Sequence, residues 1–83
     1  MAIAPLMGVC SSALQYDITD DGRVTGVRFA GGCPGNLEAV SRLVEGLPAE
    51  AVISRLEGIR CGSKPTSCPD QLARALQEAI DAL

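Results

Sequence analysis

Apolar and polar residues alternate along two stretches in the first half of the chain, which is the pattern of half-buried β-strands. The alternation predicts strands over residues 12–19 and 24–30. The inward-facing positions are expected to be Ser12, Leu14, Tyr16 and Ile18 in the first strand and Thr25, Val27 and Phe29 in the second. Asp20-Asp21-Gly22-Arg23 lies between them and predicts a hairpin turn, because Asp-Gly accommodates the positive φ angles of such turns.

The rest of the chain changes to helical spacing, in segments separated by glycine and proline. The first helix is expected to follow Cys33-Pro34 and to end at Gly46, which can adopt a left-handed cap. The second helix is expected from Pro48 to Gly58, and the third from Pro69 onward. The apolar stripes of the three helices are Leu37, Val40, Leu43 and Val44; Val52, Ile53 and Leu56; and Leu72, Leu76, Ala79, Ile80 and Leu83.

This order of elements predicts an α+β fold, with a small antiparallel sheet of two to three strands and about three helices packed on one face. Two strands alone are marginally stable, so a third short strand is expected near residues 7–10 or 59–61. Residues 1–8 are otherwise expected to form a loose lead-in, that is, an N-terminal segment without regular secondary structure. A chain of 83 residues is too short to divide, which predicts a single domain over residues 1–83.

Charge and composition exclude several classes of function. The net charge is −3 and the seven basic residues are scattered, whereas nucleic-acid-binding surfaces combine a basic stripe with stacking rings. No apolar run is long enough to cross a membrane, and the N-terminus lacks the basic segment of a secretory leader. We therefore expect a cytoplasmic protein that binds neither nucleic acid nor membrane.

The candidate chemistry lies in the four cysteines, since the chain has no histidine and so no Ser-His, Cys-His or His-metal pair. Their spacing, C-x22-C-x27-C-x6-C, lacks the paired C-x2-C of zinc ribbons. All four fall in predicted loops or at predicted helix starts, and disulfides are rare in the cytoplasm. Four thiolates suit Zn²⁺ or an iron–sulphur cluster. The predicted metal ligands are Cys10, Cys33, Cys61 and Cys68.

Two of these cysteines are each followed by proline at the predicted first turn of a helix, in Cys33-Pro34 and Cys68-Pro69. The cysteine then lies at or beside the N-cap, where unpaired N–H groups and the positive helix end favour a thiolate. Arg60 and Lys64 flank Cys61 and act in the same direction. Candidate hydrogen-bond donors to the thiolates are Ser11, Ser12, Ser63, Thr66 and Ser67.

The segment Thr66-Ser67-Cys68-Pro69-Asp70 spells TSCPD, and the chain resembles the small stand-alone four-cysteine branch of the TSCPD-domain family. The other matching motifs are Gly8-Val9-Cys10-Ser11, Gly31-Gly32-Cys33-Pro34-Gly35-Asn36, Leu43-Val44-Glu45-Gly46 and Gly58-Ile59-Arg60-Cys61-Gly62. The resemblance implies a relation to a C-terminal domain of vitamin B12-dependent ribonucleotide reductases. It implies an accessory module, because a chain of this length lacks the barrel and the nucleotide pocket of a ribonucleoside-diphosphate reductase.

A fainter similarity links the hairpin and cysteine loop, residues 21–33, to iron–sulphur scaffold proteins of the NifU type. That similarity implies cysteines gathered at one end of an α+β domain, without the scaffold's usual histidine. Three functions follow as hypotheses. The first is a metal-binding module with an accessory or interaction role and no catalytic residue. The second is a thiol-redox partner of a ribonucleotide reductase, with Cys61 and Cys68 forming a reversible disulfide. The third is a partner-binding domain with inert cysteines.

Overall fold

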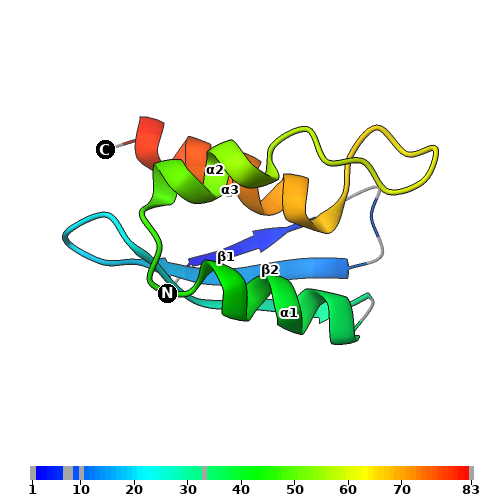
Figure 1. The fold of residues 1–83 in the computed structure, drawn as a ribbon, viewed down its shortest axis with the longest axis horizontal. Helices are drawn as coiled ribbons and strands as arrows, with labels where there is room; N and C mark the ends of the chain where they lie inside the picture. Colours follow the sequence, from blue (N-terminus) through cyan, green and yellow to red (C-terminus); the bar gives the residue numbers. More distant parts are fainter. Residues whose placement is uncertain (1, 7–8, 10, 33, 83) are drawn as a thin grey trace.

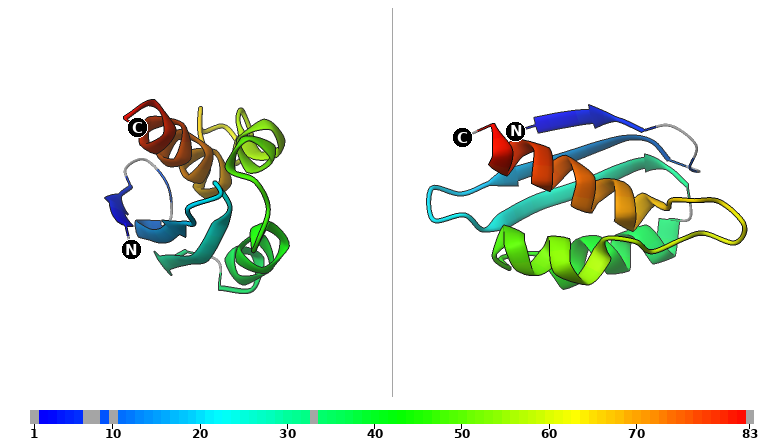
Figure 2. Two further views of the ribbon diagram at one scale, coloured as in Figure 1. Left: turned by 90° about the vertical axis from the view of Figure 1, so that its left-hand side faces the viewer. Right: turned by 90° about the horizontal axis from the view of Figure 1, so that it is seen from above.

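The computed structural model describes residues 2–6, 9, 11–32 and 34–82. Within these ranges one antiparallel sheet has the order β1-β2-β3, with β1 at Ala2–Pro5, β2 at Ser11–Ile18 and β3 at Val24–Gly31. The helices are α1 at Pro34–Val44, α2 at Ala49–Leu56 and α3 at Cys68–Asp81. They cover one face of the sheet, with α2 beside α3 and α1 beside β3 (Figures 1 and 2). The predicted α+β class is therefore confirmed.

The third strand lies at β1, so the prediction of a loose lead-in is wrong for residues 2–5. Ala2 lies opposite Tyr16 and Ala4 opposite Leu14, whereas Ile3 faces away from the helices and is 66% exposed. Because β1 has only four residues and its inward side chains are small, its sequence pattern is too short to predict a strand. Pro5 is compatible with it, because an edge strand tolerates a missing N–H. Residues 59–61 are not a strand, and residues 7, 8 and 10 lie outside the described residues.

Two register shifts between β2 and β3 change which residues face the helices. Ser12 is exposed and Ser11 is buried instead, so the predicted inward position of Ser12 is wrong. In β3 the shift lies at Gly26, whose φ is +63°. This bulge turns both Val24 and Val27 inward and leaves Thr25 half-buried, contrary to strict alternation.

The core lies between the sheet and the helices, and it is aliphatic apart from Tyr16. Its buried members are Leu6, Leu14, Tyr16, Val24, Val27, Val44, Ala49, Val52, Ile53, Leu72 and Leu76. Leu43 is the exception to the predicted helical stripes, because it is 76% exposed on α1. Leu83 lies outside the described residues.

The connection from α1 to α2 pairs with the first half of β3. Val24 N–H donates to the Leu47 carbonyl oxygen at 2.8 Å, and Gly46 N–H donates to the Val24 carbonyl oxygen at 2.7 Å. Pro48, expected to begin the second helix, is its N-cap and forms an antiparallel bridge with Arg23. Gly46 has a φ of +78°, as the predicted left-handed cap requires. No helix in the described part of the chain is long and apolar enough to cross a membrane.

Candidate functional site

Helix α3 begins at Cys68, and its first turn is capped from the residue before. The Ser67 side chain accepts the Asp70 N–H at 3.1 Å, which satisfies one of the unpaired donors of the helix start. Pro69 follows within the first turn, as the sequence predicts. The Cys68 side chain is 4% exposed, and its thiol donates to the Ser11 hydroxyl with an Sγ–Oγ distance of 3.2 Å.

Ser11 connects three elements at this end of the domain. It begins β2, it accepts the Cys68 thiol, and its own hydroxyl donates to the Gly31 carbonyl oxygen at the end of β3 at 3.2 Å. Cys10 directly precedes Ser11, and Cys33 follows Gly31 by two positions. Both predicted ligands, Cys10 and Cys33, lie outside the described residues.

Cys61 lies in the loop between α2 and α3 and is exposed. Its N–H donates to the Thr66 carbonyl oxygen at 3.2 Å, and its carbonyl oxygen accepts the Lys64 N–H at 3.0 Å. These two bonds close a turn that contains Gly62, whose φ is +59°. The turn fixes the backbone at Cys61 while the side chain stays accessible.

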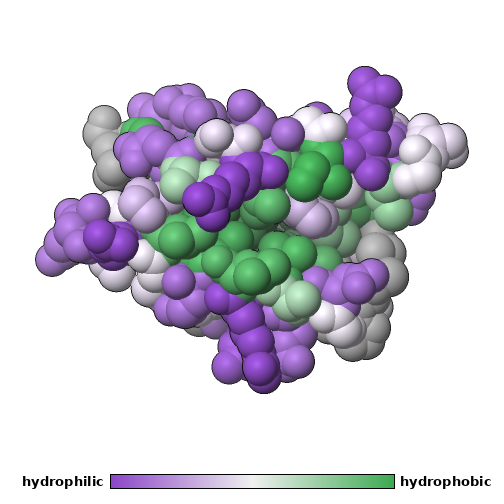
Figure 3. Space-filling model, viewed as in Figure 1, coloured by the Kyte–Doolittle hydropathy of each residue, from purple (hydrophilic) through white to green (hydrophobic). Residues whose placement is uncertain are grey.

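Cys61 and Cys68 line one pocket of about 210 Å³. Arg60 and Lys64 contribute to its wall, so the cationic neighbours predicted for Cys61 lie at the site. The other lining residues are Val9, Asn36, Leu37, Val40, Ile59, Ser67 and Pro69. An apolar region extends across this face of the molecule between α1 and α2, as Figure 3 shows. The site is thus a largely apolar pocket lined also by two cysteines and two basic residues.

Val9 and Asn36 lie close in sequence to the two cysteines that the structure does not describe. Val9 directly precedes Cys10, and Asn36 is three residues after Cys33. Both line the pocket that contains Cys61 and Cys68. Residues close in sequence to Cys10 and Cys33 therefore line the same pocket as Cys61 and Cys68.

Asp70, which the sequence analysis did not assign to any role, organises the loop that carries Cys61. It is 3% exposed, and its carboxylate accepts the Gly58 N–H at 2.7 Å. The other carboxylate oxygen accepts the Thr66 hydroxyl and lies 3.0 Å from the Arg74 Nε. The spacing Ser67-x-x-Asp70 is that of a capping box, and this signal could have identified the residue.

The protonation of Asp70 is set by opposing effects. Burial raises the pKa of this carboxyl, but hydrogen bonds from Thr66 and Gly58 and the charge of Arg74 outweigh burial and hold the pKa below its ordinary value. The carboxylate is therefore charged at neutral pH. It ties both ends of the loop to the first turn of α3.

The candidate hydroxyl donors divide into two groups. Ser11 contacts a cysteine sulphur, but as the acceptor of the Cys68 thiol and not as the predicted donor. Thr66 and Ser67 instead hold the loop, because Thr66 donates to Asp70 and Ser67 donates to the Ile59 carbonyl oxygen at 2.7 Å. Ser12 donates to the Ala30 carbonyl oxygen at 3.4 Å on the exposed side of the sheet. Ser12 and Ser67 thus donate to the backbone, and Thr66 donates to a side chain.

Among the described residues, which include Cys61 and Cys68 but neither Cys10 nor Cys33, no group of three or more metal-ligating side chains lies together. The donor set still fits a soft metal chemically. Thiolate sulphur is the preferred ligand of structural zinc and of iron–sulphur clusters. The Ser11 hydroxyl can reverse its hydrogen bond and donate to a Cys68 thiolate across the same 3.2 Å.

Comparison with known proteins gives one family. The family model of the TSCPD domain matches residues 4–80, which is nearly the whole chain. No curated protein and no solved structure matches, so the fainter similarity to NifU-type scaffolds has no support. The matched range contains the five residues Thr66 to Asp70 at the start of α3 and the pocket beside them. The chain therefore belongs to the TSCPD-domain family.

Proposed function

We propose that the protein is a small metal-binding module in which Cys10, Cys33, Cys61 and Cys68 hold one zinc ion or one iron–sulphur cluster. The observation that carries the proposal is the pocket lined by Cys61 and Cys68, whose wall also contains Val9 from the segment of Cys10. A third sulphur from that segment and a fourth from the segment of Cys33 complete the ligand set.

The surroundings of the pocket suit bound thiolates. Four thiolates and a divalent cation carry a net charge of −2, and Arg60 and Lys64 lie at the pocket to offset it. Cys68 lies at the positive end of α3, which also stabilises an anion. The Ser11 hydroxyl, which accepts the Cys68 thiol at 3.2 Å, can donate to the sulphur once Cys68 is a thiolate, and such outer partners orient metal ligands.

The expected role of the bound metal is structural. A site closed by four thiolates leaves no position for substrate, and it cross-links segments that are far apart in the sequence. Small domains, below about 80 residues, rarely gain more than about 3–5 kcal/mol from the hydrophobic core, and in a chain close to that size a metal cross-link adds materially to stability. We propose an accessory or interaction role, with a ribonucleotide reductase as the partner that the family resemblance indicates.

The test is to purify the full chain without oxygen and to measure zinc, iron and the visible spectrum. We expect metal near one equivalent per chain, and we expect Cys61→Ser and Cys68→Ser each to lower it. Ser54→Ala, an exposed change on α2 outside the pocket, is the matched control and should retain the metal.

Thiol titration distinguishes the alternatives. Metal-free protein in which Cys61 and Cys68 oxidise to a disulfide contradicts the metal site. In that reaction the two cysteines lose two electrons and two protons to an added disulfide oxidant, which is reduced to two thiols. That result supports thiol-redox exchange, for which exposed Cys61 and buried Cys68 in one pocket form a suitable pair. Metal-free protein with unreactive thiols supports a partner-binding domain with inert cysteines.

A further inference from the structure

The outer edge of β3 is divided into a paired half and an open half. Near its start, Val24 exchanges hydrogen bonds with Gly46 and Leu47. Further along, the Gly26 N–H donates to the Glu45 carboxylate at 3.0 Å. Beyond Gly26, among the described residues, no segment pairs with β3 on the side away from β2. An unpaired strand edge is a template for an added strand.

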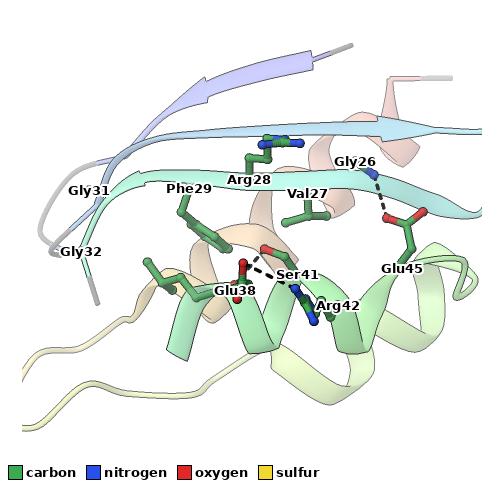
Figure 4. A pocket seen from close by; sticks show the side chains of 11 residues that line it. Gly26, Val27, Arg28, Phe29, Gly31, Gly32, Glu38, Ser41, Arg42 and Glu45 are labelled. Carbon is green, nitrogen blue, oxygen red and sulfur yellow. Dashed lines mark hydrogen bonds and ion pairs between the residues drawn. The ribbon is translucent and has the colours of Figure 1, made fainter. Parts of the chain in front are cut away.

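A groove follows this open half. It has a volume of about 710 Å³ and lies between β3 and α1. Figure 4 shows Val27 and Phe29 pointing from β3 toward α1, with Glu38 and Arg42 on the opposite wall and Arg28 pointing away from the helix. Leu37 also lines it. The floor is therefore apolar and the wall along α1 is charged.

The charges on the groove wall are largely satisfied within the chain. Arg42 lies 3.8 Å from Glu38, one helical turn away, and Glu45 is occupied by the Gly26 N–H. Arg28 is exposed, and among the described residues it has no ion-pair partner. A strand that added to β3 would place an outward-facing side chain next to Arg28, and a carboxylate there is complementary.

We propose that this groove binds an extended segment of a partner protein, in which apolar and acidic residues alternate, as an added strand on β3. The backbone of the segment pairs with residues 27–31. Its apolar side chains enter the groove over Val27 and Phe29, and its acidic side chains face outward beside Arg28. The chain's own residues 46–48 already use the same edge in this way, so the partner continues an existing ladder.

The probe is a fluorescein-labelled peptide, acetyl-Val-Glu-Val-Glu-Val-amide, added to the full chain. We expect it to bind, and we expect its lysine counterpart, with Lys for Glu, to bind about fivefold more weakly. Arg28→Glu should reverse that preference. Arg55→Glu, an exposed change on α2, is the matched control and should leave it unchanged. Backbone amide protection should rise at residues 27–31.

A second peptide tests the backbone pairing itself. The same Val-Glu sequence methylated at its three Val nitrogens keeps its side chains and loses three of its five residue N–H groups. We expect it to bind at least about tenfold more weakly than the unmethylated peptide. Equal binding of the two peptides, no binding of either, or amide shifts confined to residues 59–69 would overturn the proposal. A peptide-free dimer with residues 27–31 protected would overturn it too and assign the edge to a second copy of the chain.

Discussion

The buried carboxylate of Asp70 accepts the backbone N–H of Gly58 at 2.7 Å, across twelve positions of sequence. This bond fixes the start of the loop that carries Cys61, and the Thr66 hydroxyl on the same carboxylate fixes its end. The loop is therefore held by a charge at the start of α3, independently of any ligand at the pocket.

Asp70→Asn should lower the free energy of unfolding by about 2–3 kcal/mol at pH 7, because hydrogen bonds to a charged group are each worth about 1.5–3 kcal/mol. Urea unfolding measures the effect. Asp81→Asn is the matched control, since Asp81 is exposed near the end of the same helix, and it should change stability by less than about 0.5 kcal/mol. Equal effects of the two substitutions would contradict the loop-holding role.

The Asp70 carboxylate also predicts that folding stability falls at acid pH. Its pKa in the folded protein lies below the ordinary value of about 3.9, because hydrogen bonds and Arg74 outweigh burial. Its contribution to stability is therefore complete above pH ~4 and is lost as the pH falls through the folded pKa. The stability difference between wild type and Asp70→Asn should shrink below pH ~4. A difference that stays constant down to pH 2 would show that Asp70 does not titrate as described.

Tyr16 predicts that folding stability falls at alkaline pH, whereas the Asp70 contribution is lost at acid pH. Burial and the charge of Glu78 raise the pKa of its phenol, and the hydroxyl donates to the Ala75 carbonyl oxygen at 3.4 Å. The neutral phenol therefore stabilises the fold fully below pH ~10, and this contribution is lost as the pH rises through the raised pKa. Tyr16→Phe should cost about 0.5 kcal/mol at pH 7. Above pH 10 the variant should lose less stability than wild type, as measured by urea unfolding.

Gly26→Ala should destabilise the protein by about 1–2 kcal/mol, because the φ of +63° at the bulge disfavours any side chain. Gly35→Ala is the paired test. An added Cβ at Gly35 meets nothing within 4 Å, and the residue lies in α1, so this substitution should stabilise by up to about 1 kcal/mol. Thermal unfolding of both variants checks the opposite signs. A neutral Gly26→Ala would mean that the bulge is not required for the register.

The two described cysteines should differ when metal is removed. In the presence of a chelator, Cys68→Ala should cost about 1 kcal/mol, since its buried thiol bonds to Ser11. Cys61→Ala should be close to neutral under the same conditions because the side chain is exposed. Without chelator both changes should destabilise, because each removes a ligand of the proposed site. Unfolding curves with and without chelator separate packing from metal binding.

The elements with strong periodicity could be predicted from sequence, and those set by long-range contacts could not. Helices bounded by Gly46, Gly58 and Pro69 carry their own start and stop signals. Strand β1 has four residues and is defined only by its pairing with β2, which a local pattern does not contain. The Gly26 bulge likewise depends on the register against β2, although an isolated glycine in a strand is a recognised sign of a bulge.

The reactive and charged residues of the candidate site could be predicted from the sequence, but the hydrogen bonds that hold its loop could not. Cys61 and Cys68 line one pocket with Arg60 and Lys64, as their positions around the start of the third helix indicated. The buried role of Asp70 was missed because an acidic residue in a first helical turn is usually solvated. Its partner Gly58 is twelve positions away and offers only a backbone N–H, which leaves no mark on the sequence.

The Asp70 network also changes what the five letters of the family signature report. The polar side chains of the signature form hydrogen bonds with nearby backbone groups and with one another; these residues are Thr66, Ser67 and Asp70. Pro69 lies in the first turn of α3. Among the five, Cys68 is the residue whose side chain can bind a soft metal or exchange a disulfide, and it lines the pocket. Four of the five letters therefore encode a loop architecture, and relatives can share the signature while differing in the reaction or partner that their loop serves.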